Sequence, residues 1–368
     1  MPLKILFIRI FFCISLFSFI PTAIYAQTNN TLHIYNWLDY IAPDTIKKFE
    51  QETGIHVIYD TFEDLEEAEQ ILLKNKHNYD IVFSYDSFLS RLARSMKLAP
   101  LNKKLLPNYK NLDPNIYKKF IWADVNQQFL IPYLWGTLGI GYNVTQIQKV
   151  LGQGAVIEGW QSIFEPANLE RLSQCGIGML DSRNDIMAIT LHLSGKNPYS
   201  LYQEDYTEVA FPFLQALRPH IKYIKDYEPI REFKAGKLCI VINWSGDILQ
   251  VVDTVLEGET PLRYIIPQEG SIIAFDGMAI PNNAKNKANA HKFINFILRP
   301  DIIAEISTYV AYPNINKAAA PFMAENLLKN LAIYPPLSMI DKLIHTQVIP
   351  PRIDRIENHL WQKFKGEK

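Results

Sequence analysis

The sequence predicts an α/β protein with two lobes, each built on a mainly parallel sheet flanked by helices. Its 368 residues are enough for two domains with cores of their own. Short apolar strands alternate with helices through both halves of the chain, which is typical of doubly wound sheets. A proline-containing stretch at 131–136 runs into a strand at 138–142, and we interpret residues 135–139 as a crossing between the lobes.

The elements of each half follow one another as strands and helices in turn. The first helix is expected at 43–52, because Pro43 favours the first helical position and Gly54 stands just past the end. The strands of the first half are expected at 32–35, 55–59 and 81–83, with helices after them at 43–52, 65–74 and 88–95. The second half repeats the rhythm, with strands at 176–180, 238–243, 264–266 and 275–280 and helices at 186–193, 248–256, 287–297 and 301–310.

The first 26 residues have the pattern of a signal peptide that is removed on export. Lys4 and Arg9 supply positive charge, an apolar run covers 10–20, and Pro21 ends it before a cleavage site after Ala26. A membrane anchor is the alternative, but the apolar run is shorter than the roughly 20 residues that span a bilayer. The mature protein is therefore expected to be exported, and the resemblance described below implies the periplasm.

Charge and cysteine usage narrow the function further. The chain holds 37 basic and 38 acidic residues without a basic patch, which argues against a nucleic-acid partner. Cys13 lies inside the signal peptide, which leaves Cys175 and Cys239 in the exported chain. Two cysteines in an exported protein most simply form one disulfide, with two buried free thiols as the alternative. Neither has a metal ligand at useful spacing, so no metal is expected.

Aromatic side chains and carboxylates meet at the ends of several expected strands. Trp37, Asp39 and Tyr40 follow the first strand, and Trp244 and Asp247 follow a strand of the second half. Aromatic rings attract a cation through their quadrupoles, and a carboxylate accepts hydrogen bonds from an ammonium group. Because open α/β sheets bind ligands at the carboxyl ends of their strands, these junctions predict a site for an organic cation.

Three further positions repeat the pattern. Asp185 shares a strand-to-helix turn with Asp181, Asp276 stands at the start of the strand at 275–280, and Tyr312 follows a helix. Each has an ordinary structural alternative, since a carboxylate in such a place also caps a helix or lies in its first turn. Taken together, the junctions predict a negatively charged cleft with aromatic walls.

Motifs of several large enzyme classes are missing. The chain has no P-loop, no HExxH, no GxSxG and no GxGxxG motif. Asp247 and Asp276 would suit the two carboxylates of a glycoside hydrolase, which remains an alternative of a different class. A sugar or amino-acid receptor is the other alternative. Sugars would not use the surplus of carboxylates, and an amino acid would need a suitably placed arginine.

Six sequence blocks resemble a known family over essentially all of the chain that follows the signal peptide. They are LHIYNWLDYIAPDT (32–45), IPYLWGTLGIGYN (131–143), CGIGMLD (175–181), INWSGD (242–247), FDGMAIP (275–281) and IYPP (333–336). The chain resembles the periplasmic polyamine-binding proteins of ABC transporters, and among them its putrescine-binding members. The resemblance implies a type II periplasmic-binding-protein fold with the ligand between two discontinuous lobes, expected at 27–136 plus about 272–318 and at 137–271 plus about 319–368.

The resemblance also implies a function and a site. It implies a receptor that captures putrescine, spermidine or a related polyamine and delivers it to a membrane permease. The receptor is expected to be a monomer without a cofactor and without catalytic activity. A sensor that reports ligand occupancy to a regulator is a further alternative. The resemblance implies as well that Cys175 and Cys239 form a disulfide. By the same resemblance, the aliphatic chain of the ligand is boxed by Trp37, Tyr40, Trp244 and Tyr312. Its ammonium groups are held by Asp247 and Asp276, Asp39 stands at a pocket position, and Asp185 stands where the putrescine-binding members have Glu.

Departures from the putrescine-binding members bear on selectivity. Leu38 replaces a Ser, Tyr85 and Asp86 replace a Ser-Ala pair, and Ala274 replaces a Phe. We expect Tyr85 and Asp86 to join the site, with Asp86 as a carboxylate at its rim; the alternative is an ordinary helix-start residue that faces solvent. A roomier and more acidic pocket predicts that spermidine is accepted at least as well as putrescine.

Overall fold

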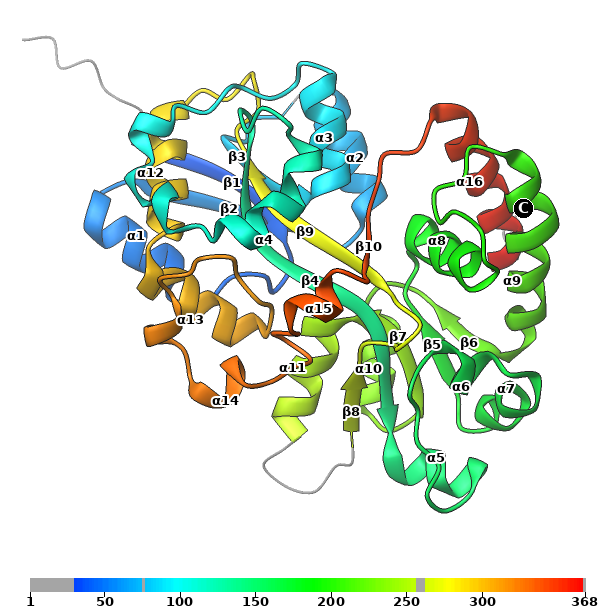
Figure 1. Ribbon diagram of the computed structural model, residues 1–368. Coiled ribbons are helices and arrows are strands. Elements are labelled where there is room, and N and C mark those ends of the chain that lie inside the picture. Colours follow the sequence, from blue (N-terminus) through cyan, green and yellow to red (C-terminus); the bar gives the residue numbers. More distant parts are fainter. Residues whose placement is uncertain (1–29, 75–76, 256–261, 367–368) are drawn as a thin grey trace, which may run out of the picture.

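The computed structural model describes residues 30–74, 77–255 and 262–366, and it shows two lobes joined by the long strand β4 (Leu130–Asn143; Figure 1). The signal peptide expected at 1–26 lies outside the described residues. Within the described ranges, no helix combines the length and the apolar character needed to cross a membrane. The two-lobed α/β fold expected from the sequence is confirmed.

The strands follow the order β2-β1-β3-β9-β4-β7-β5-β6, with β10 beside β9 and β8 beside β4. In the first lobe, β1 pairs in parallel with β2 and β3, and β9 lies antiparallel between β3 and β4. In the second lobe, β7 and β5 are parallel, as are β5 and β6. The remaining strands are β1 (Thr31–Trp37), β2 (His56–Phe62), β3 (Ile81–Tyr85), β5 (Ile177–Met179), β6 (Ile221–Ile224), β7 (Ile240–Trp244), β8 (Leu262–Ile265), β9 (Ile272–Ala279) and β10 (Ile344–His345).

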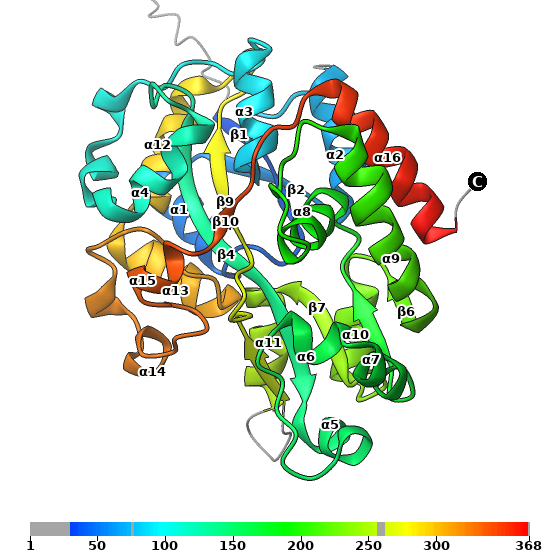
Figure 2. The ribbon, with the colours of Figure 1, turned by 45° about the vertical axis from the view of Figure 1, so that its right-hand side comes forward.

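Helices flank both sheets (Figures 1 and 2). In the first lobe, Phe49 of α1 is fully buried and packs edge-on against Phe293 of α12 with ring centroids 5.0 Å apart. In the second lobe, the buried Trp160 donates from Nε1 to the carbonyl of Gly270 at 2.9 Å. The α-helices are α1 (Thr45–Thr53), α2 (Leu65–Lys74), α3 (Asp86–Arg94), α4 (Pro114–Phe120), α5 (Val144–Leu151), α6 (Trp160–Phe164), α7 (Pro166–Ser173), α8 (Arg183–Leu193), α9 (Phe211–Leu217), α10 (Glu228–Lys234), α11 (Ser245–Val255), α12 (Lys287–Ile297), α13 (Pro300–Val310), α14 (Glu325–Leu328), α15 (Leu337–Ile340) and α16 (Pro351–Lys365).

Three connections join the lobes. Within β4, residues 130–137 pair with β9 of the first lobe and residues 138–143 pair with β7 and β8 of the second. The chain returns to the first lobe between β8 and β9. It crosses again after β10, which pairs with β9, because α16 packs against α8 and α9 of the second lobe; Figures 1 and 2 both show this last crossing.

The segment between α13 and β10 touches both lobes. Residues 320–322 pack against α13, whereas Leu327 and Ile333 are buried with Ile248 and Leu249 of α11. The lobe boundaries expected from the resemblance therefore stay a prediction for this part of the chain.

The structure corrects several expected elements. The strand expected at 138–142 already begins at Leu130, and Pro132 is accommodated where the register with β9 shifts. The crossing expected at 135–139 lies within β4, whose pairing passes from β9 to β7 between residues 137 and 138. Asp276 lies inside β9 instead of at the start of a strand. Strands β6 and β10 and helix α16 were not expected, whereas α2 and α12 have the expected bounds.

Candidate functional site

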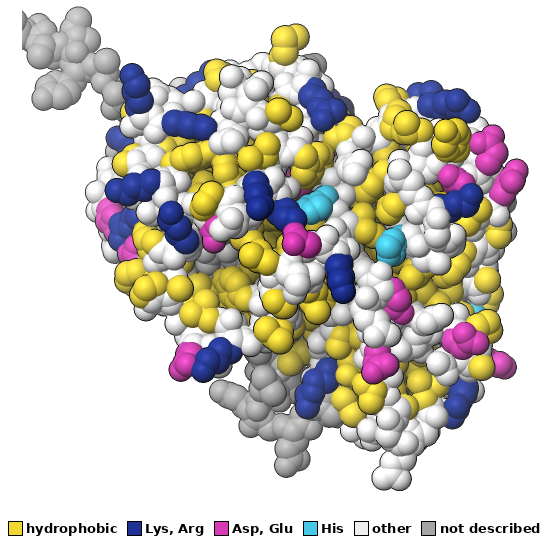
Figure 3. Space-filling model, in the orientation of Figure 1, with side chains coloured by type: hydrophobic (Ala, Val, Ile, Leu, Met, Phe, Trp, Pro, Cys, Tyr) yellow, Lys and Arg dark blue, Asp and Glu magenta, His cyan; other side chains and the backbone are white. Residues whose placement is uncertain are grey.

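A cavity of about 990 Å³ lies between the lobes. Figure 3 shows the notch between the lobes on one face of the molecule. Nearly all of the residues predicted for the site line this cavity, and Asp86 is the exception. The predicted residues that line it are Trp37, Asp39, Tyr40, Tyr85, Asp185, Trp244, Asp247, Asp276 and Tyr312.

Asp276 is held by two aromatic side chains of the first lobe. Trp37 donates from Nε1 to one carboxylate oxygen at 3.0 Å, and the Tyr40 hydroxyl donates to the other at 2.9 Å. Burial raises the pKa of Asp276 to about 7, although these two hydrogen bonds lower it; the neighbouring Asp247 raises it further. A cation bound beside this carboxyl group would therefore favour its charged form.

Asp247 lies in the first turn of α11, in the second lobe. Burial raises its pKa to about 6, and a hydrogen bond from the Tyr312 hydroxyl lowers it. The Tyr312 ring fits a slot made by two glycines, because a Cβ on Gly246 would lie 2.0 Å from the ring and one on Gly136 would lie 2.7 Å from it. These glycines let Tyr312 reach Asp247 across the boundary between the lobes.

Aromatic rings form a continuous wall from one lobe to the other. The Tyr85 ring lies 5.0 Å from Trp37 and 6.0 Å from Trp244, measured between centroids. Tyr40 and Tyr312 make an edge-to-face pair at 5.2 Å. Because Tyr85 also pairs across the sheet with Asp276, the rings stand directly beside the carboxylate. Such an arrangement suits methylene groups that end in a cationic group.

A further carboxylate lies on the second-lobe side of the cavity. Asp185, on α8, is 5% exposed and accepts a hydrogen bond from the Ser182 hydroxyl at 2.5 Å. Burial raises the pKa of Asp185 to about 6. The hydroxyl of Tyr199, which also lines the cavity, is buried without a hydrogen-bond partner among the described residues. Asp39, by contrast, is exposed at the mouth and has a positive φ of 52°.

Asp86 is not at the rim, so the position expected for it is wrong. Its side chain is fully buried, and it does not face solvent either. One carboxylate oxygen accepts from the Thr346 hydroxyl at 2.7 Å and from the Ser87 amide at 2.6 Å. Burial raises the pKa of Asp86 well above its usual range. The first turn of α3 points this side chain inward, under the cavity wall.

Asp226 and Tyr227 line the cavity and were missed. Burial raises the pKa of Asp226 to about 7, and the charges of Asp181 and Asp64 raise it further. Both residues follow β6, a four-residue strand with no clear alternation in the sequence. Because this strand was not predicted, its end was not searched for ligand-binding residues. Asp181 itself contacts α16, because Trp361 of that helix donates a hydrogen bond from Nε1 to its carboxylate at 2.6 Å.

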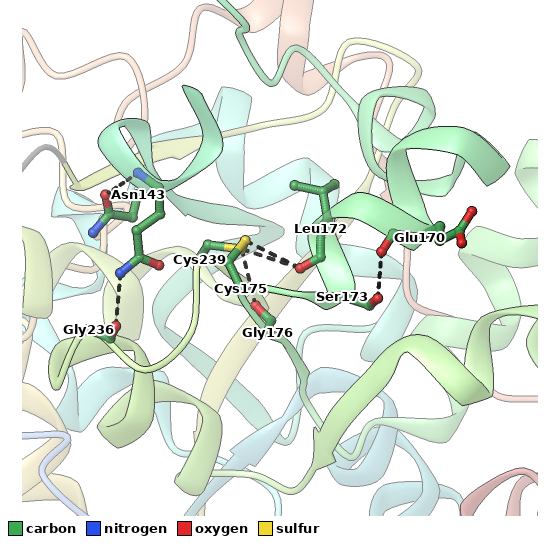
Figure 4. The surroundings of a disulfide bond; sticks show 9 residues. Asn143, Glu170, Leu172, Ser173, Cys175, Gly176, Gly236 and Cys239 are labelled. Carbon is green, nitrogen blue, oxygen red and sulfur yellow. Dashed lines mark hydrogen bonds between the residues drawn. A yellow bond between two sulfur atoms is a disulfide. The ribbon is translucent and has the colours of Figure 1, made fainter. Parts of the chain in front are cut away.

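The disulfide between Cys175 and Cys239 is confirmed (Figure 4). It joins the end of α7 to the residue before β7, and the two Cα atoms lie 5.5 Å apart. In the part of the chain that the structure describes, no group of His, Cys, Asp and Glu side chains is arranged to hold a metal ion.

Comparison with known proteins places this geometry in a family. The family of bacterial extracellular solute-binding proteins matches residues 44–333. The chain is 41% identical to the putrescine-binding periplasmic protein of Escherichia coli over 345 residues, which are 93% of each chain. It is 30% identical to the spermidine/putrescine-binding periplasmic protein of the same species over 317 residues, 85% of this chain and 86% of the relative.

Solved structures agree with the sequence comparisons. A putative spermidine/putrescine ABC transporter protein from Listeria monocytogenes superimposes with a TM-score of 0.82 at 31% identity, over 91% of this chain and 99% of that one. A spermidine/putrescine substrate-binding protein from Streptococcus pneumoniae gives 0.77 at 28% identity, over 91% and 98%. The chain has the type II periplasmic-binding-protein fold and belongs to the bacterial extracellular solute-binding proteins.

Proposed function

We propose that this protein is the receptor of an ABC importer and binds putrescine, spermidine or a related linear polyamine between its lobes. The observation that carries the proposal is the pair of Asp276 and Asp247 in one cavity walled by aromatic rings. Among the described residues, neither carboxylate forms an ion pair with a basic side chain. A buried carboxylate without a cationic partner is costly, and an ammonium group of the ligand would supply that partner.

The proposed mode of binding follows from the positions of the groups. One ammonium group lies between Asp276 and Asp247, the methylene chain lies against Trp37, Tyr85 and Trp244, and a second ammonium group reaches toward Asp185. The first two carboxylates belong to different lobes, so a bound cation joins them and favours the closed arrangement. The ligand leaves unchanged, because the proposed function includes no chemical step.

The proposal extends to the setting of the protein. Named relatives are periplasmic binding proteins, which supports a periplasmic location for this chain. Its signal peptide would be removed after Ala26, where the sequence offers a cleavage site. The mature protein would act as a monomer that delivers its ligand to an inner-membrane permease. N-terminal sequencing of the exported protein tests the cleavage, and a mature form that still contains Cys13 would contradict it.

A thermal-shift screen followed by calorimetry tests the proposed ligand class. The panel contains putrescine, cadaverine, spermidine and spermine beside sugars and neutral amino acids. A ligand that binds the folded state raises the unfolding midpoint by mass action, so we expect a shift with the polyamines and none with the sugars. A shift with sugars alone, or turnover of a glycoside, would overturn the proposal.

A further inference from the structure

The connection from β10 to α16 forms one wall of the cavity. We call residues 346–350 the strap; four of its residues, at 346–349, line the cavity. On the first lobe the strap follows β10, which is only two residues long and pairs with Ile272 and Ile273 of β9. On the second lobe it ends at Pro350, which precedes α16. The strap is therefore both a cavity wall and a connection between the lobes.

One side-chain hydrogen bond holds the start of the strap to the first lobe. The Thr346 hydroxyl donates to Asp86 at 2.7 Å, although the two residues are 260 positions apart in the chain. Asp86 is fully buried and Thr346 is 8% exposed, so little water can compete for this bond. Loss of one partner of a buried hydrogen bond leaves the other polar group unsatisfied, which costs more than the bond itself contributes.

Asp86 also neighbours the aromatic wall. It directly follows Tyr85, whose ring lies between Trp37 and Trp244. The bond to Thr346 therefore fixes the strap relative to the end of β3 that carries this ring. Asp86 does not line the cavity itself, so any effect on ligand must pass through the groups that it holds.

We infer that Asp86 is a positioning residue that ties the strap to the first lobe through Thr346 and sets the point where this connection bends. With the bond in place, the strap leaves the first lobe after Thr346. Without it, the cavity wall at 347–349 would lose its side-chain hydrogen bond to the first lobe and would be held by the two-residue ladder of β10 and by the packing of Ile349 against the core. Release of a bound ligand would then become faster, because the wall must move for the lobes to separate.

The experiment compares Thr346→Val with Thr346→Ser in the full mature protein. Valine removes the hydroxyl and keeps the shape, whereas serine keeps the donor. For Thr346→Val we expect faster amide exchange at 346–350 without ligand, and a polyamine dissociation rate raised about tenfold in stopped-flow measurements, equal to about 1.4 kcal/mol. The association rate should change little, and Thr346→Ser should stay close to the wild type.

A matched control distinguishes the loss of the bond between Thr346 and Asp86 from the loss of any buried threonine hydroxyl. Thr190 is 2% exposed, and its hydroxyl donates only within α8, to the carbonyl of Ile186. Thr190→Val should leave both the exchange at the strap and the dissociation rate unchanged. If Thr346→Val behaves like Thr190→Val in both measurements, the inference is wrong.

Substitutions at Asp86 test the other partner. Asp86→Asn keeps an oxygen acceptor, and Asp86→Ala removes it. We expect Asp86→Ala, Thr346→Val and their double variant to release ligand at similar rates, since all three lose the same bond, while Asp86→Asn stays near the wild type. Additive effects, or Asp86→Asn matching Asp86→Ala, would overturn the inference.

The ligand measurements rest on the proposed polyamine function, but the exchange measurement does not. If the wild type binds no polyamine, the proposed function fails, and exchange at the strap still decides whether Asp86 anchors it.

Discussion

Polyamine affinity should depend steeply on pH between 5 and 8, because the cavity carboxyl groups have raised pKa values. Asp276 has a pKa of about 7, and Asp247 and Asp185 have values of about 6. A cation binds the ionised carboxylates, so affinity falls as the pH drops through these values. Lowering the pH from 8 to 5 should cost about 100-fold for Asp276 and about tenfold for each of the other two, if they titrate independently.

Calorimetry in buffers of different ionisation enthalpy measures the protons released on binding. From the same pKa values, about two protons should leave at pH 6 and fewer than one at pH 7. Asp276→Asn should remove the largest part of this release. Affinity that stays constant from pH 5 to 8, with no proton release, would refute the reasoning.

Stability of the ligand-free protein should respond to pH with the opposite sign. A carboxyl group whose pKa is higher in the folded than in the unfolded state binds more protons when folded. Its contribution to the free energy of unfolding is fully present below the unfolded value of about 4 and is lost as the pH rises through the folded value. The stabilisation that a polyamine adds should therefore grow as the pH rises toward 8.

Four further predictions follow from the cavity and the disulfide. Asp247→Asn should weaken polyamine binding by roughly 2–5 kcal/mol and Trp244→Ala by at least about 0.5–2 kcal/mol, with the fold intact; unchanged calorimetric affinity for both would remove them from the site. Gly246→Ala should displace the Tyr312 ring and weaken binding without lowering the unfolding midpoint to the same degree, which calorimetry and thermal unfolding compare. Denaturing, non-reducing thiol labelling of the mature protein should find no free cysteine, and replacing both cysteines of the pair by alanine should lower the free energy of unfolding by up to about 4 kcal/mol. Because Leu38 offers no polar contact, spermidine should bind at least comparably to putrescine, and a preference for putrescine above about tenfold in competition calorimetry would contradict this.

The alternation of strands and helices was readable because local signals agreed with the fold. Helix α12 has the expected bounds, and so does α2. The second-lobe strand β6 was missed because four residues with two buried positions carry no pattern of their own. The first half of β4 was also not predicted as a strand, because Pro132 is unusual inside a sheet and is accommodated here only at a shift of register.

The candidate site was predictable where strand ends carry aromatic and acidic residues together. The burial of individual site residues could not be predicted from the sequence. Asp86 has the sequence context of an exposed helix-start residue, and only the approach of Thr346 from the far end of the chain shows why it is buried. Asp226 was not predicted as a site residue for a related reason, because the strand before it, β6, was not recognised in the sequence.

The rings of the cavity show how two departures from the family pattern act together. Ala274 lacks the ring expected there from the resemblance, and it lies two residues before Asp276 on β9, facing the same cavity. Tyr85 supplies a ring from the neighbouring strand, directly opposite Asp276. The aromatic wall therefore lies close to Asp276, the carboxylate proposed to bind one end of the ligand, and space is left beside Ala274. Ligand preference should then depend both on this space and on the other end of the cavity, near Asp185, where the second ammonium group would bind.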